Sequence, residues 1–304
     1  SVTLAELNLF KLDDSPRIAI TVDDGIYSGD GGTTVNGTTY IASVLDEYGV
    51  KGTFYVIGRY TDVSGNPNTR LSEGDLGLPG NNVYCNKEDF LALQASGHLI
   101  ANHTWDSPRG YEDNDVPGTL DAEYVGEAGV SNYLDSVRRM NEWLREYGFH
   151  GYDLLALPFG EIRRDVVEAL MRPGQPICRQ IRTVMAMNDV NPHHRFASEQ
   201  TPDDFYNYRH WPLFTDPVIP VSVNLDLSNS GSNPSLIDLV KQHKCTVTCY
   251  THTMSPGSSK ETELRAICQA AVDGEIETIL VNEMLPSGAT SGSGGSGGER
   301  ALGL

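Results

Sequence analysis

Positive charge is scarce in this 304-residue chain, in which 22 Lys and Arg residues stand against 41 Asp and Glu residues, for a formal net charge of -19. Phosphate backbones and anionic lipid surfaces repel such a chain, so we expect no nucleic-acid partner. Long apolar runs are also missing, since no segment approaches the roughly 18 apolar residues of a membrane-spanning helix. We therefore expect no membrane span, and neutral or cationic partners fit the composition better.

Cysteines are few and follow no pairing pattern. The five of them, at positions 85, 178, 245, 249 and 268, are odd in number and include no C-x-x-C pair, which excludes a disulfide framework and a zinc ribbon. We interpret them as small apolar core residues. The first residues, Ser1 to Leu4, lack the basic and apolar regions of a signal peptide, so the sequence leaves the localisation open.

The C-terminal end differs in composition from the rest. Residues 287–298 form a Gly- and Ser-rich tract that cannot bury apolar surface. We therefore predict one domain over residues 1–286 and a tail over residues 287–304. A further hypothesis is that this tail joins the chain to a larger protein assembly.

The most informative short stretch is Asp23-Asp24-Gly25, which closes the β-branched run of residues 18–22. That run predicts a buried strand ending in a tight turn. Neighbouring residues of an extended chain point to opposite sides, so one carboxylate can hold a metal while the other acts as a base. The alternative is a plain Asp-Asp-Gly turn without chemistry.

Apolar runs and helical periodicity alternate along the chain. We predict strands at residues 18–22, 50–58, 98–105, 152–157, 182–187, 218–227, 246–251 and 278–282, and helices at residues 40–48, 87–96, 131–147, 165–171, 234–243 and 260–271. Ser131 is the predicted N-cap of its helix. Residues 26–39 and 59–84 are predicted to be loops. About seven strand and helix alternations indicate an α/β protein with a closed or nearly closed barrel of parallel strands.

Three blocks in this order carry a resemblance to a known family. Residues 21–25 (TVDDG) resemble T-F-D-D-G, residues 45–58 (LDEYGVKGTFYVIG) resemble L-x-x-Y-G-V-K-A-T-F-F-V-x-G, and residues 97–105 (GHLIANHTW) resemble G-H-E-I-G-N-H-T-W. The chain is thus similar to the polysaccharide deacetylase family, which is carbohydrate esterase family four or the NodB homology domain. The resemblance implies a distorted (β/α)7 barrel.

The resemblance also implies a divalent metal, most often zinc. The second Asp of the family's first motif corresponds to Asp24, and the first His of its H-x-x-x-H pair corresponds to His103. The position of the second His holds Ser107. Catalytic zinc sites typically use three protein ligands. Asp106 is the candidate replacement ligand, and the alternative is that no metal is bound.

The family's catalytic groups map onto several further positions. Asp23 corresponds to the general base, and His252, in a segment that resembles L-x-H, to the general acid. Residues 158–160 resemble the end of R-x-P-Y-G, which makes the backbone N–H of Phe159 the oxyanion donor. The Arg of that motif, which pairs with the base, is replaced by Ala156, and Arg163 or Arg164 are candidates to reach in.

Candidate substrate contacts are Trp105, Pro158 and Trp211, although each Trp is also a plausible packing residue. Asp189 is a faint match to the fourth motif. We interpret His193, His194 and His210 as loop residues, and the alternative is that one of them supplies a missing metal ligand.

Three functions compete. The first is a hydrolase that removes acetyl groups from a polysaccharide or amino-sugar glycan with help from a metal, in an extracellular or virion-surface setting. The second is a catalytically weakened deacetylase fold that serves as a structural or glycan-binding component of an assembly such as a virion, as the departures at Ser107 and Ala156 suggest. The third is a metal-free amide hydrolase.

Overall fold

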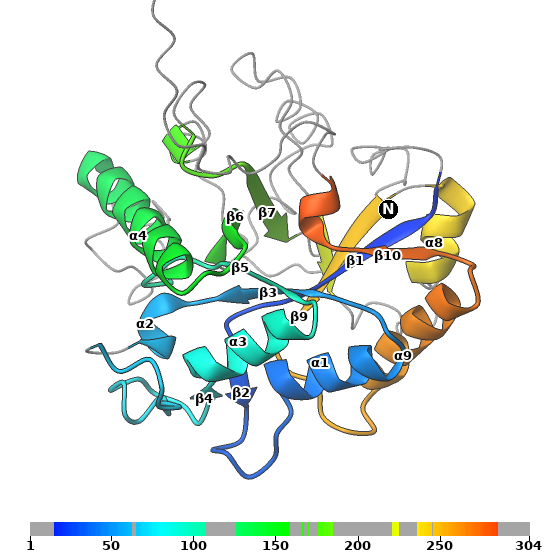
Figure 1. Ribbon diagram of the computed structural model, residues 1–304, viewed down its shortest axis with the longest axis horizontal. Coiled ribbons are helices and arrows are strands. Elements are labelled where there is room, and N and C mark those ends of the chain that lie inside the picture. The colour runs from blue at the N-terminus through cyan, green and yellow to red at the C-terminus, as the bar shows by residue number, and fades with distance from the viewer. Residues whose placement is uncertain are drawn as a thin grey trace, which may run out of the picture.

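The fold is built around strand β1 (Arg17–Val22), whose last five residues are fully buried. A computed structural model describes residues 15–62, 65–107, 126–158, 166, 169–170, 176–184, 221–224, 236–244 and 246–284. Because β1 is apolar or Thr at every position after Arg17, it can be covered on both faces, as parallel strands in α/β proteins are. The strand occupies the middle of Figure 1.

Seven parallel strands pair in a closed ring. Around the ring β1 is followed by β3 (Thr53–Val56), β5 (Leu99–Asn102), β6 (Gly151–Ala156), β7 (Gln180–Val184), β8 (Val221–Asn224) and β9 (Thr246–Thr251). The ring closes because β9 pairs with β1 over its full length, from Arg17 beside Thr246 to Val22 beside Thr251. The expected (β/α)7 barrel is confirmed.

One further strand distorts the ring. Strand β10 (Glu277–Ile279) pairs with the first half of β1, at residues 17–19, whereas β3 pairs with the second half, at Thr21 and Val22. Just after β10, the backbone N–H of Val281 donates to Oγ1 of Thr53, the first residue of β3, at 3.3 Å. β10 therefore lies beside β1 where a regular barrel would have β3.

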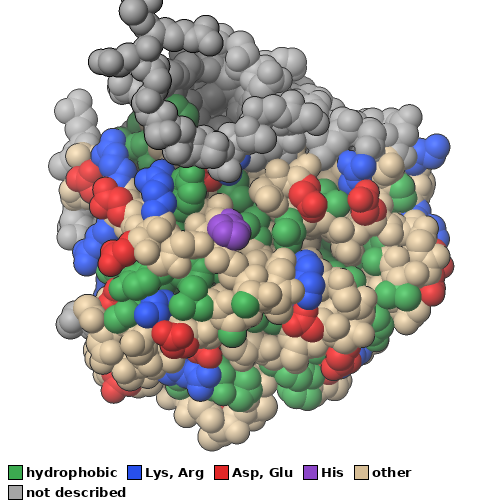
Figure 2. Space-filling view, viewed as in Figure 1, with side chains coloured by type: hydrophobic (Ala, Val, Ile, Leu, Met, Phe, Trp, Pro, Cys, Tyr) green, Lys and Arg blue, Asp and Glu red, His purple; other side chains and the backbone are tan. Residues whose placement is uncertain are grey.

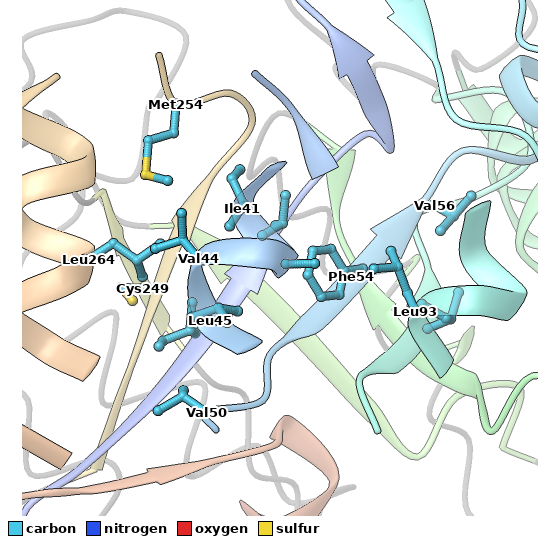
Figure 3. Packing of buried hydrophobic residues seen from close by; sticks show 14 of the residues in the cluster. Ile41, Val44, Leu45, Val50, Phe54, Val56, Leu93, Cys249, Met254 and Leu264 are labelled. Atoms are coloured by element: carbon cyan, nitrogen blue, oxygen red, sulfur yellow. The ribbon is translucent and has the colours of Figure 1, made fainter. Parts of the chain in front are cut away.

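Helices cover the outside of the barrel (Figure 1). In the described residues these are α1 (Thr38–Glu47), α2 (Gly58–Thr61), α3 (Lys87–Ala95), α4 (Gly126–Glu146), α8 (Leu236–His243) and α9 (Ser259–Val272). The 3-10 helix η6 (Val281–Met284) instead packs into the cluster that contains Tyr55 and Ala156. The main core lies between helices and strands. There Ile41 and Val44 of α1 belong to one buried cluster with Phe54 of β3 and Leu264 of α9 (Figure 3).

Two local predictions are wrong. Ser131 lies inside α4, because Glu127 and Ala128 ahead of it favour helix and the helix begins at Gly126. The predicted loops at 26–39 and 59–84 contain β2 (Ile26–Ser28) and β4 (Val83–Tyr84), which pair antiparallel with each other. Local periodicity cannot reveal a two- or three-residue strand whose partner lies more than fifty residues away.

The cysteines, the helix lengths and the surface charge can be compared with expectation within the described residues. Cys85, Cys178, Cys249 and Cys268 are buried and free, which fits the core role. None of the helices in the described ranges is long and apolar enough to cross a membrane. On the face in Figure 2, acidic and basic side chains are interspersed. The predicted tail at 287–304 and most of the helix at 165–171 lie outside the described residues.

Candidate active site

Four predicted site residues, two catalytic groups and two metal ligands, lie together at the carboxyl ends of the barrel strands. Asp23 and Asp24 follow β1, His103 follows β5, and His252 follows β9. In a barrel of parallel strands this end carries the loops that build active sites. The structure therefore gathers four residues that are far apart in the sequence.

The turn after β1 requires its Asp-Gly sequence. Asp24 and Gly25 both have left-handed backbone conformations, with φ of 69° and 74°. Asp tolerates this region better than most residues, and at Gly25 a Cβ atom would lie 2.9 Å from the ring of Phe90. The backbone N–H of Asp23 donates to the carbonyl of Thr251 at 3.0 Å, which ties the turn to the end of β9.

Asp24 lies between two histidines. Its Oδ1 is 3.1 Å from His103 Nε2, and its Oδ2 is 3.6 Å from His252 Nε2. Burial opposes ionisation of this carboxyl, but His252, His103 and Arg182 together outweigh it and lower the pKa of Asp24 to about 2. Asp24 is therefore ionised in the folded protein and attracts cations to this point.

Backbone contacts fix the orientation of His103. Its Nδ1 lies 2.9 Å from the carbonyl oxygen of Ala156, which can only accept, so Nδ1 carries a proton and Nε2 faces Asp24. Burial disfavours the imidazolium, but the hydrogen bond that His103 donates to Asp24 and the charge of Asp23 raise the pKa of His103 above its ordinary value. The ring is thereby held as a partner of the Asp24 carboxylate.

The turn that carries His103 is held by Asn102. Thr104 adopts a φ of 66°, which is strained for a β-branched residue. Asn102 Oδ1 accepts from the backbone N–H of Thr104 at 2.5 Å, while its Nδ2 donates to Val137 O and to Asn141 Oδ1. These bonds to α4 keep the strained turn, and with it His103, in place.

Arg182 is the site residue that sequence reasoning missed. Its side chain is 0% exposed, and its Nη2 donates to Asp23 Oδ2 at 2.5 Å. The other candidates for this role, Arg163 and Arg164, lie outside the described residues. The signal was present in the sequence, because a cation within a predicted buried strand requires a buried anion.

The second oxygen of Asp23 faces a different environment. The Asp23 side chain is 4% exposed, and its Oδ1 is buried without a hydrogen-bond partner among the described residues. Buried polar atoms normally have a hydrogen-bond partner, which in native proteins can be an ordered water molecule.

The described residues do not fit a catalytic zinc ion. They contain no group of three or more His, Cys, Asp or Glu side chains placed to hold a metal, so Asp106 is not gathered with Asp24 and His103. The backbone N–H of Asp106 donates to Ser136 Oγ at 3.0 Å, and that of Ser107 to Thr104 Oγ1 at 2.9 Å. Two protein ligands fall short of the three that catalytic zinc sites use, so we assign no step to a metal.

The candidate substrate contacts have different surroundings. Trp105 is 6% exposed, with the Arg139 guanidinium 3.9 Å from its ring centroid and Gly58 packed so closely that a Cβ there would clash with the indole. These surroundings are typical of a packing residue, which is the alternative to the predicted substrate contact. Pro158 is buried next to β6. Outside the described residues lie the predicted sites Phe159, Trp211, Asp189, His193, His194 and His210.

Comparison with known proteins identifies the family. The family model described as polysaccharide deacetylase matches residues 11–176, and the chain belongs to this family. No curated protein matches the chain.

Several solved structures are similar to this chain. The peptidoglycan deacetylase PdaC from Bacillus subtilis is 14% identical with a TM-score of 0.45, over 90% of this chain and 92% of that chain. The chitin deacetylase from Colletotrichum lindemuthianum is 11% identical with a TM-score of 0.43, over 90% and 89%. The Xyl-CE4 domain of a multidomain xylanase from the hindgut metagenome of Trinervitermes trinervoides is 12% identical with a TM-score of 0.45, over 89% of each chain.

Proposed function

We propose that this protein is a hydrolase that removes acetyl groups from a polysaccharide or amino-sugar glycan. The observation that carries the proposal is the state of Asp23, whose Oδ2 is anchored by Arg182 while its buried Oδ1 has no partner among the described residues. A general base needs such an oxygen, held in place and free to accept a proton. Membership of the polysaccharide deacetylase family supports a carbohydrate substrate.

The proposed reaction begins with water. Asp23 Oδ1 takes a proton from a water molecule while the oxygen of that water bonds to the acetyl carbonyl carbon. His252, 44% exposed at the edge of the site, gives a proton to the leaving amine or alcohol as the bond from the acetyl carbon to it breaks. Acetate and the deacetylated sugar result. Asp24 Oδ2 lies 3.6 Å from His252 Nε2 and helps to orient this ring.

The net charge bears on the choice of glycan. At -19 the chain favours a neutral polymer, or one that gains amino groups as acetyl groups leave it, over an anionic polymer. An N-acetylated amino-sugar polymer meets this condition, because each hydrolysis exposes an amine. We therefore place chitin-type oligosaccharides first among substrates, ahead of acetylated xylan.

A non-catalytic glycan-binding role is the alternative. It is supported by the departures from the family pattern at Ser107 and Ala156. Arg182 weakens the second of these arguments, because Asp23 retains a cationic partner despite the change at 156.

Acetate release tests the proposal. Purified protein is incubated with N-acetylchitooligosaccharides, peptidoglycan fragments and acetylated xylan, with and without EDTA, and acetate is quantified. We expect release on at least one substrate and a loss of about 100-fold or more in Asp23→Asn, which keeps the shape of the side chain but removes the base. The control is Asp135→Asn, an exposed carboxylate on α4. Absence of acetate, or equal rates in wild type and Asp23→Asn, would overturn the proposal.

The EDTA arm separates two forms of the reaction. Metal-assisted hydrolysis stops when the chelator removes the ion, whereas the metal-free amide hydrolase of the third hypothesis keeps its rate.

A further inference from the structure

We propose that Arg182 is the positioning residue for Asp23, supplied from β7 in place of the arginine that the family motif carries at position 156 on β6. The inference rests on the proposed hydrolase function and deepens it. It concerns how the general base is held, and it explains how the site keeps a cation although Ala156 has removed one.

Strand register places Arg182 beside the vacant position. β6 and β7 are parallel, and their paired residues include Leu154 with Gln180 and Ala156 with Arg182. Paired residues of neighbouring strands lie about 4.8 Å apart and face the same side of the sheet. Ala156 belongs to the cluster inside the barrel with Tyr55, and Arg182 contacts the Tyr55 ring, so positions 156 and 182 both face the interior. An arginine at position 182 on β7 therefore lies at the same height along the barrel axis as one at position 156 on β6.

Hydrogen bonds fix the guanidinium at two points. Its Nη2 donates to Asp23 Oδ2 at 2.5 Å, and its Nη1 donates to Thr21 Oγ1 at 3.1 Å. The Thr21 hydroxyl donates its own hydrogen to the carbonyl oxygen of Cys249 at 2.8 Å, so it can only accept from Arg182. Both anchors lie in or next to β1, which carries the base.

Two aromatic rings also contact the guanidinium of Arg182. Its carbon lies 4.8 Å from the ring centroid of Tyr55 and 5.7 Å from that of Tyr250. Rings at these distances attract the cation and limit its movement. A planar, permanently charged group held in this way fixes one oxygen of Asp23 and leaves the other to the reaction.

A buried ion pair could also be purely structural, and the test must distinguish the two roles. A structural role predicts that loss of Arg182 lowers stability with no specific effect on turnover. A positioning role predicts that the loss acts on kcat and only through Asp23.

The experiment uses the Arg182→Met variant, which keeps most of the stem without charge, in wild-type and Asp23→Asn backgrounds. On N-acetylchitooligosaccharides, or on whichever substrate releases acetate, we expect kcat to fall about 100-fold in Arg182→Met with KM changed by less than about threefold. In the Asp23→Asn background the same substitution should change the residual rate by less than about twofold, because no base is left to position. Arg182→Lys should recover part of the loss.

Arg179→Ala is the matched control. Arg179 precedes the same strand and forms an ion pair with Asp153, away from the base, with one contact at 2.8 Å. Its removal should leave kcat within about twofold of wild type. Low millimolar guanidinium should restore activity to Arg182→Ala, while equal sodium chloride should not.

Two failures can be told apart. A wild-type protein that releases no acetate refutes the proposed function, and this inference with it. An active wild type whose folded Arg182→Met and Arg182→Lys variants keep kcat within about threefold refutes the inference alone, as does an equal loss in both backgrounds. If Arg182→Met does not fold, Arg182→Lys carries the same comparison.

Discussion

Arginine introduced at position 156 is expected to destabilise the protein, although it restores the family residue. Ala156 is fully buried, and its paired neighbour on β7 is Arg182, whose guanidinium already contacts Asp23. Forcing a large side chain into a packed interior costs about 1–3 kcal/mol. A second buried cation without a carboxylate of its own costs about 3–5 kcal/mol. Together these give about 4–8 kcal/mol, a large part of the roughly 5–15 kcal/mol that stabilises a typical protein.

Urea unfolding followed by circular dichroism measures this effect. Five proteins are compared: wild type, Ala156→Arg, Arg182→Ala, the double variant, and Ala156→Met. The double variant should be at least about 3 kcal/mol more stable than Ala156→Arg, because the new arginine then has both the space and the anion that Arg182 leaves. Ala156→Met reports the steric cost without the charge.

The opposite result would refute the reasoning. If Ala156→Arg were as stable as wild type and more active, a guanidinium at position 156 would still find space and a carboxylate partner. Arg182 would then not replace the motif arginine.

Two other predictions concern the histidines. Ser107→His should raise the zinc retained after dialysis to about one ion per chain, as measured by elemental analysis. The new His adds a third donor to Asp24 and His103, and His tolerates the left-handed φ of 53° at this position. An unchanged zinc content would contradict this prediction. Burial lowers the pKa of His98 from 6.5 to about 4. Between these pH values the unfolded chain binds a proton at His98 that the folded protein does not. The free energy of unfolding should therefore fall by about 3 kcal/mol from pH 6.5 to pH 4. His98→Asn, which can still accept from Gly52 N–H, should lack this component in urea unfolding at each pH, and an identical pH dependence in both proteins would count against it.

Much of the fold could be predicted from the sequence because local patterns specify it. The apolar run at residues 18–22 became β1, and the spacing of Ile41, Val44 and Leu45 became the buried face of α1. In each of these segments the spacing of the apolar residues indicates the type of secondary structure. The pairing of β2 with β4 escaped prediction because neither segment has enough residues to show a period.

The site divides in the same way. Asp23, Asp24, His103 and His252 were predicted as one site from the motifs that contain them, and the structure brings them together. Arg182 lies in no motif. Its role depends on the register of β6 against β7, which is a property of the folded sheet and not of any short segment.

The pairing of Arg182 with Asp23 changes how the missing motif arginine should be understood. A fully buried guanidinium needs an anion, and a buried carboxylate needs a cation, so either residue alone would destabilise the barrel by several kcal/mol. The two residues are therefore coupled, whatever the residue at position 156. Since paired positions on neighbouring strands face the same interior space, a cation can be supplied from either strand and still reach the same carboxylate. Loss of a motif residue removes a function only when the contact it made is lost as well, and here that contact is kept.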